Sequence, residues 1–167
     1  MNRPPRVVIV GDVILDRDVS GSATRLSPDA PVPVVDVEMT AERAGGAGLA
    51  ARLCAADDAT VTLIAPIADD SPGRRLTELL SAGLTLVPLP HGGPTRCKTR
   101  VLTNGQVVVR LDDGGPGTPV QPPLDAIRRH LLSADLVLVS DYGAGTTRDA
   151  GLRTLCAEAA TRVPLVW

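Results

Sequence analysis

The chain has 167 residues, 44% of them apolar and 22% charged, which is the balance of one soluble globular domain. Its net charge is -2 and only 1% of its residues are aromatic, so we expect neither a basic nucleic-acid-binding surface nor aromatic platforms for single-stranded bases. Three cysteines without metal-ligand spacing, no secretory signal and no membrane-length apolar run predict a cytoplasmic protein with no membrane contact and no metal site.

Short apolar segments alternate with helical patterns along the chain. We predict strands over 7–10, 32–37, 61–65, 84–89, 107–111, 136–140 and 165–167. Helices are predicted over 47–56, 72–81, 123–132 and 148–161, the second of them beginning after Asp70 or Ser71. This alternation indicates an α/β protein whose parallel sheet is covered by helices on both faces.

Two segments interrupt the alternation and are predicted to form strands outside the main sheet. Residues 18–38 have no helical pattern and are rich in proline, serine and valine. Residues 95–112 are predicted to form a hairpin that turns at Asn104-Gly105, a strong short-range hairpin signal. We interpret both segments as a β flap over a site.

A two-residue turn at Asn104-Gly105 would place Thr99 opposite Arg110 and Arg96 opposite Asp113. Alternation then places three cations on one face of the hairpin, Arg96, Lys98 and Arg100, with Arg110 on the other face. Such a row suits a phosphate group. The alternative is a solvated edge strand that uses charge to prevent aggregation.

Acidic residues follow two of the predicted strands. Asp12 and Asp16 come after the first strand, and Asp141 comes after the strand over 136–140. In open α/β sheets the ligand crevice lies at the carboxyl ends of the strands, where carboxylates can accept hydrogen bonds from sugar hydroxyls. The alternative is that Asp12 caps a turn and Asp16 lies on the surface.

The segment 46–51 matches the dinucleotide-binding fingerprint G-x-G-x-x-A, and Asp69 follows at a suitable distance. The fingerprint should directly follow its strand, yet seven residues, 38–44, separate this segment from the strand predicted over 32–37. A dinucleotide-binding domain is therefore a rival interpretation. The glycines can also expose backbone N–H groups to a ligand oxygen at the start of a helix.

Taken together, several motifs resemble the PfkB (ribokinase-like) carbohydrate kinases. Within that family the chain is most similar to the heptose 7-phosphate kinase domain of bacterial ADP-heptose synthesis enzymes. The motifs, in family order over nearly the whole chain, are Gly11-Asp12-Val13-Ile14-Leu15-Asp16-Arg17, Arg25-Leu26-Ser27-Pro28-Asp29-Ala30-Pro31-Val32-Pro33-Val34, Gly45-Gly46, Val61-Thr62-Leu63, Lys98-Thr99-Arg100-Val101, Arg110-Leu111-Asp112 and Ser140-Asp141-Tyr142-Gly143.

The resemblance implies a parallel sheet with helices on both faces and a small β lid, the lid often serving as a dimer contact. Residues 1–167 would be the N-terminal part of one kinase domain, with lid segments at about 18–38 and 95–112 and with the C-terminal half of the fold missing. A sugar or sugar phosphate would bind at Asp12, Asp16, Gly45, Gly46, Lys98, Arg100, Arg110 and Asp141.

The resemblance also implies an ATP-dependent sugar kinase. The complete family enzyme uses Mg-ATP and an aspartate base in a Gly-Ala-Gly-Asp motif, which we expect to lie beyond residue 167. We therefore expect no catalytic residue in this chain, no tight nucleotide binding and little activity from the chain alone. A non-catalytic sugar-phosphate-binding or interaction remnant is the alternative.

Overall fold

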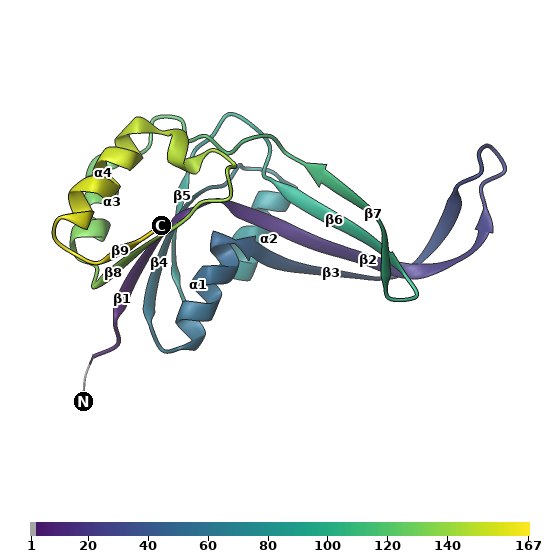
Figure 1. Ribbon diagram of the computed structural model, residues 1–167, viewed down its shortest axis with the longest axis horizontal. Helices are drawn as coiled ribbons and strands as arrows, with labels where there is room; N and C mark the ends of the chain where they lie inside the picture. The colour runs from purple at the N-terminus through teal and green to yellow at the C-terminus, as the bar shows by residue number, and fades with distance from the viewer. Residues whose placement is uncertain (1–2) are drawn as a thin grey trace.

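The structure, a computed structural model, describes residues 3–167 and contains two β-sheets (Figure 1). The first, the central sheet, has five parallel strands in the order β5-β4-β1-β8-β9. Its strands are β1 (Arg6–Gly11), β4 (Thr60–Pro66), β5 (Thr85–Leu89), β8 (Leu136–Ser140) and β9 (Leu165–Val166).

Helices cover both faces of the central sheet, which confirms the expected α/β class. Along β1, Ile9 packs into a core with α1 (Ala47–Ala56) and α2 (Ser71–Leu80). Its neighbour Val8 packs into a second core with α3 (Leu124–Leu132) and α4 (Ala150–Ala160). This is the period-2 alternation of a strand buried on both faces. None of the helices within residues 3–167 is long and apolar enough to cross a membrane.

Two helix starts depend on aspartate caps. Asp70 accepts a 2.8 Å hydrogen bond from the Gly73 amide and begins α2, as predicted. The start predicted for the last helix, residue 148, is wrong, because Asp149 caps α4 through the Leu152 amide at 2.8 Å. A short 3₁₀ turn, η1 (Thr146–Arg148), precedes that cap.

The second sheet, here called the lid, has the strand order β3-β2-β6-β7 and projects away from the rest of the protein, the body (Figure 1). Its strands are β2 (Val13–Leu26), β3 (Pro33–Gly46), β6 (Cys97–Thr103) and β7 (Gln106–Asp113). The segments 18–38 and 95–112 lie in this sheet or at its edges. The strand predicted over 32–37 is longer than predicted, since pairing with β2 extends β3 to Gly46, at the start of α1.

The β6–β7 hairpin turns at Asn104-Gly105, as predicted, and both residues have positive φ angles, 49° and 75°. The predicted register holds for Thr103 and Gln106 but is wrong farther from the turn. A bulge that leaves Val108 without a register partner shifts the pairing by one residue. Arg110 therefore lies opposite Arg100 and shares its face, whereas Cys97, and not Arg96, lies opposite Asp113.

The order of the central sheet marks the end of β1, here called the crevice, as the expected ligand region. The chain places β4 and β5 on one side of β1, and then β8 and β9 on the other. The carboxyl ends of β1 and β8 are thus a topological switch point, where open α/β sheets bind ligands. Asp12 directly follows β1 and Asp141 directly follows β8. The lid strand β2 starts one residue after Asp12, so the lid rises from the same crevice.

At the opposite end of the sheet, Asp135 ties the start of β8 to the start of the described chain. Arg3 donates two hydrogen bonds of 2.8 and 2.7 Å to its carboxylate, and the Arg6 amide donates a third of 2.8 Å. The Arg3 guanidinium and the Arg6 amide hold the pKa of Asp135 well below its ordinary value. The charged carboxylate therefore stabilises the folded state at neutral pH.

We expect Asp135→Asn to lower the thermal midpoint at pH 7. Because the folded pKa is depressed, the difference from the parent protein should shrink as the pH falls below about 4, where the unfolded carboxyl group begins to bind its proton. Thermal denaturation from pH 7 to pH 2 measures this, with Asp57→Asn as the control, since the Asp57 side chain has no hydrogen bond or ion pair within residues 3–167. A pH-independent difference would contradict the assignment.

Candidate functional site

Asp16 and Gly45 lie together on one face of the lid, next to the crevice. Gly45 is the register partner of Ile14, and alternation along β2 puts Asp16 on the same face. A Cβ atom on Gly45 would lie 2.3 Å from Asp16 Oδ2, so a larger residue at this position would have to displace the carboxylate. The Asp16 carboxylate therefore lies directly against the backbone of Gly45.

The Asp16 carboxylate is mostly buried but accepts no hydrogen bond from residues 3–167. Its side chain is 17% exposed, and the cation beside it is Arg100, whose Nη1 lies 3.9 Å from Asp16 Oδ1. A mostly buried carboxylate with unused acceptor sites is well suited to a ligand that brings several hydroxyl donors.

The Asp12 carboxylate is occupied by contacts within the described residues, which favours the alternative interpretation of Asp12 as a cap of a turn. It is 2% exposed and accepts four hydrogen bonds from the loop that follows β8. Oδ2 accepts from the amides of Tyr142 and Ala144, both at 2.9 Å. Oδ1 accepts from Thr146, from its amide at 3.0 Å and from its hydroxyl at 2.7 Å. These contacts make Asp12 a clamp that shapes the loop, whereas direct binding of a sugar by Asp12 stays a prediction.

Asp141 belongs to the same loop, and its side chain makes its hydrogen bonds within that loop. Its carboxylate accepts hydrogen bonds from the Gly143 amide at 2.7 Å and from the Thr147 hydroxyl at 2.9 Å. The residue is exposed, so it retains acceptor sites that face solvent. Asp141 therefore stays near the crevice, but its two contacts stabilise the loop's own conformation.

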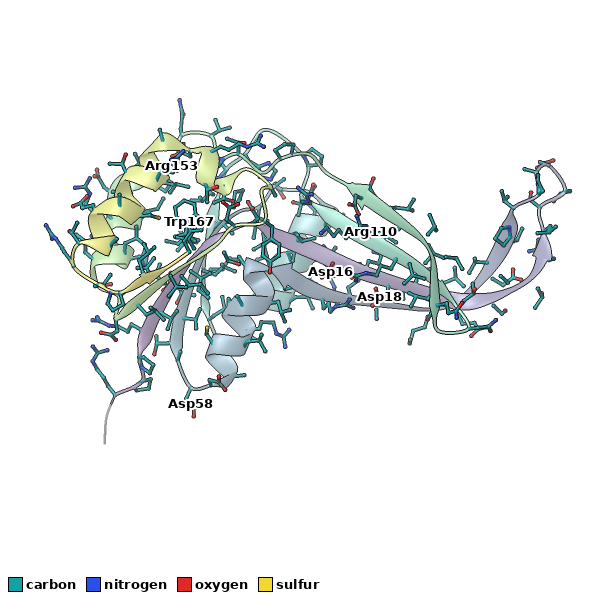
Figure 2. All side chains as sticks on the ribbon, in the orientation of Figure 1. Asp16, Asp18, Asp58, Arg110, Arg153 and Trp167 are labelled. Atoms are coloured by element: carbon teal, nitrogen blue, oxygen red, sulfur yellow. The ribbon has the colours of Figure 1, made fainter. Side chains whose placement is uncertain are left out.

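The lid face on which we predicted a row of cations carries both positively and negatively charged side chains. Lys98 and Arg100 do share a face, and Arg110 joins them because of the bulge. Carboxylates and one further arginine lie on this same face, at Asp16, Asp18, Asp112 and Arg43. Figure 2 shows Asp16, Asp18 and Arg110 close together in the middle part of the lid. The expectation of three neighbouring cations around an anion is therefore wrong as stated.

Ion pairs on this face leave its cations unequally neutralised. Arg100 lies 3.4 Å from Asp18, which also binds Arg43. The hydrogen bonds from Arg43 hold the pKa of Asp18 below its ordinary value against the opposing effect of burial. Arg110 pairs with Asp112 at 3.0 Å. Lys98 has no ion pair within residues 3–167, so it is the cation of this face with the most charge left for a ligand.

Arg96 precedes β6 and does not continue the row. It lines a cavity of about 10 Å³ together with Asp12, His91 and Thr146. This space is about the size of one water molecule and is far too small for a sugar. Arg96 therefore lies at the base of the lid, where its carbonyl oxygen accepts a 2.9 Å hydrogen bond from the Leu15 amide.

Gly46 is constrained by the crevice and does not start a dinucleotide site. Its φ angle is 58°, and a Cβ atom there would lie 2.3 Å from the Asp12 carbonyl oxygen. The same oxygen accepts a 2.9 Å hydrogen bond from the Ala47 amide, the first of α1. The preceding strand is β3, an antiparallel strand of the lid. The fingerprint at 46–51 therefore lacks the parallel strand–turn–helix unit that pyrophosphate binding needs.

Sequence reasoning missed Arg43, Asp18 and Thr146. Arg43 is the register partner of Asp16 and lies on the same face of the lid as Gly45. Extending the second lid strand to Gly46 would have placed it there by alternation. Thr146 is completely buried and holds Asp12, a contact that no local pattern in the sequence indicates. Within residues 3–167, no three His, Cys, Asp or Glu side chains form a metal-binding group.

Comparison with known proteins gives one consistent group of relatives. The chain is 51% identical over 161 residues to the bifunctional protein HldE of Streptomyces coelicolor, covering 96% of this chain and 33% of the relative. It is 40% identical over 144 residues to the D-beta-D-heptose 7-phosphate kinase of Bordetella bronchiseptica, covering 84% of this chain and 46% of the relative. No protein-family model matches. The chain thus spans between a third and a half of these relatives' length.

Solved structures show the same fold at lower sequence identity. A carbohydrate kinase from Agrobacterium tumefaciens superposes with a TM-score of 0.70 at 22% identity, covering 96% of this chain and 52% of that one. The phosphofructokinase-2 of Escherichia coli in complex with fructose-6-phosphate gives a TM-score of 0.68 at 16% identity, covering 99% and 54%. These similarities establish the fold, of which the chain spans about half the length.

Proposed function

Because this chain belongs in sequence and fold with the PfkB-type (ribokinase-like) carbohydrate kinases, we propose that it supplies the sugar-binding side of an ATP-dependent kinase for a heptose phosphate or a similar sugar phosphate. The observation that carries the proposal is the free acceptor capacity of Asp16, held over the bare backbone of Gly45 at the mouth of the crevice. A sugar brings several adjacent hydroxyl groups, which can donate the hydrogen bonds that residues 3–167 do not supply to this carboxylate.

In the proposed complex, Asp16 accepts hydrogen bonds from sugar hydroxyls and fixes the orientation of the ring. Gly45 and Gly46 shape the site beside the sugar, because the Asp16 carboxylate and the Asp12 carbonyl oxygen occupy the space that their side chains would fill. Lys98, which has no ion pair within residues 3–167, attracts the phosphate group. Arg100 and Arg110 also bind the phosphate when it displaces their carboxylate partners. Asp12 and Asp141 shape the loop beside the ring.

The nucleotide that donates the phosphoryl group is distinct from the sugar that accepts it. Mg-ATP supplies the phosphoryl group in kinases of this type, and the transfer depends mainly on positioning and charge stabilisation. The described residues gather no metal-binding group, so the role we assign to them is binding and orienting the acceptor sugar.

Isothermal titration calorimetry with heptose 7-phosphate tests the proposal. We expect saturable binding that weakens when the same heptose is offered without its phosphate. NADH serves as the comparison ligand for the rival dinucleotide interpretation. Tight binding of NADH together with no heat from heptose 7-phosphate would overturn the proposed function.

We also propose that the lid pairs with the lid of a second copy. On the face opposite to Asp16, Val19, Val101 and Val109 lie in register across three neighbouring strands. Leu111 follows on the same face, and the side chains of Val109 and Leu111 are about half exposed. An apolar row on a projecting sheet is the kind of surface that another copy covers.

We expect Val109→Glu to weaken self-association by roughly tenfold or more, because it would bury a charge in that apolar row. Val107→Glu is the matched control, since Val107 lies on the opposite face beside Leu102 and is similarly exposed. Sedimentation velocity over a concentration series measures both variants. Equal effects of the two substitutions, or a parent protein that stays monomeric at high concentration, would contradict pairing through this face.

A further inference from the structure

An ion-pair network joins the back of the lid to helix α2. Glu42 on β3 accepts a 2.9 Å hydrogen bond from Arg17 Nε on β2 and another of 2.9 Å from Arg75 Nε on α2. Arg75 also donates to Glu78 on its own helix at 2.9 Å. The Glu42 side chain is only 19% exposed, so its carboxylate is held between two guanidinium groups with little access to water.

This network is the one ion-pair connection between lid and body within residues 3–167. The other pairs on the lid, such as Arg43 with Asp18 and Arg110 with Asp112, lie entirely within it. The pairs of the body, such as Arg74 with Asp69, lie entirely within the body. Apolar packing also attaches the base of the lid to α2, but Glu42 and Arg75 add a directional contact farther out.

The network contacts β2 and β3 at the segments that carry Asp16 and Gly45, the residues that we propose face the sugar. Arg17 follows Asp16 directly, and successive side chains of a strand point to opposite faces. Arg17 and Glu42 are register partners, and Glu42 is three residues before Gly45. Helix α2 therefore holds these two strands from behind, at the position where their front carries Asp16 and Gly45.

The charge of Glu42 persists at neutral pH. Burial by itself would raise the pKa of its carboxyl group, but the hydrogen bonds from Arg17 and Arg75 outweigh burial and keep that pKa below its ordinary value. A poorly hydrated carboxylate that loses one of two cations is left undercompensated. The network should therefore resist any movement of the lid that separates Glu42 from Arg75.

We propose that Glu42 and Arg75 are positioning residues that hold the lid at the angle at which Asp16 and Gly45 face the sugar. This inference rests on the proposed function for the role of Asp16, but the lid angle it concerns is a property of the protein without ligand. Breaking the contact should broaden the range of lid angles. Only a fraction of the molecules would then be ready to bind sugar.

The test compares Arg75→Met with Arg74→Met in the 167-residue protein. Methionine keeps much of the apolar stem of arginine and removes the charge. Arg74 is the neighbouring residue of the same helix, and its pair with Asp69 stays within the body. Spin labels at Gln106→Cys on the lid hairpin and Asp125→Cys on α3, in a Cys54→Ser background, report the lid–body distance by double electron–electron resonance.

We expect Arg75→Met and Glu42→Gln to broaden this distance distribution and Arg74→Met to leave it unchanged. If the binding-competent fraction falls to about a fifth, the dissociation constant for heptose 7-phosphate rises about fivefold. Arg75→Lys, which keeps the charge, should recover part of both effects. Unchanged distances in Arg75→Met would overturn the inference, whereas absence of heptose 7-phosphate binding by the parent protein would overturn the proposed function instead.

Discussion

Replacing Asp16 with asparagine is expected to weaken binding of heptose 7-phosphate by roughly 10- to 100-fold, the loss that follows from removing hydrogen bonds to a charged acceptor. The carboxylate accepts no hydrogen bond from residues 3–167, so its acceptor sites are available to the sugar. An amide in its place loses the charge and presents two N–H donors to hydroxyl groups. Calorimetric titration measures the change.

Asp18→Asn is the matched control for this prediction. It removes the same charge from the same face of the same strand, but Asp18 is occupied by Arg43 and Arg100. We expect it to loosen the pairing of the lid's own arginines and to change sugar affinity much less than Asp16→Asn. If the two substitutions weakened binding equally, the effect would be one of overall lid charge, and the specific role of Asp16 would be wrong.

Asp12→Ala is expected to destabilise the fold by about 3 kcal/mol or more, since each buried donor that loses its partner costs about 1–3 kcal/mol. Three backbone amides and one hydroxyl group of the loop 142–146 depend on this carboxylate. Relaxation of the loop toward water limits the loss. Urea denaturation measures the free energy of unfolding, and amide hydrogen exchange at Tyr142, Ala144 and Thr146 shows where the protection is lost.

Two further variants separate the clamp from a direct role in binding. Thr146→Val removes only the hydroxyl donor and should cost a fraction of the Asp12→Ala effect. Asp12→Asn keeps the shape and one acceptor oxygen, and should be intermediate. If Asp12→Asn abolished sugar binding while the unfolding free energy and the exchange protection of the loop stayed at parent values, Asp12 would be a sugar ligand and the clamp would not be its main role.

The broad architecture could be predicted from local pattern alone. The alternation of short apolar strands with helical periodicity predicted a parallel sheet covered on both faces, and the two cores confirm it. Asp70 and Pro72 predicted the start of α2 because the first turn of a helix has specific chemical needs. These are features that depend on neighbouring residues.

The lid shows where local pattern is insufficient. The one-residue bulge at Val108 moves Arg110 to the face of Arg100, and nothing in the three consecutive valines of β7 marks the position of the bulge. Likewise, residues 38–44 lack the apolar alternation of a half-buried strand, because much of the lid is exposed on both faces. Their strand conformation comes from pairing with β2.

The closeness of Asp12 to the loop that follows β8 was predictable from the strand ends, but the individual environments of the aspartates were not. Strand ends drew attention to Asp12, Asp16 and Asp141 together. Their environments differ for long-range reasons: a loop 130 residues away saturates Asp12, whereas Gly45 leaves Asp16 open. The residue type alone cannot assign different roles to two aspartates that are four positions apart in the sequence. Their contacts in the folded protein do assign them.

The most direct measurement is a titration of ¹⁵N-labelled protein with heptose 7-phosphate, followed by amide chemical shifts. The account predicts saturable changes that are largest at Asp16, Gly45 and Gly46, with smaller changes along β6 near Lys98. Saturable changes centred elsewhere, for example on the groove that Arg153 and Trp167 line at α4 and β9, would contradict the proposed site. No change at millimolar ligand would contradict sugar-phosphate binding by this chain.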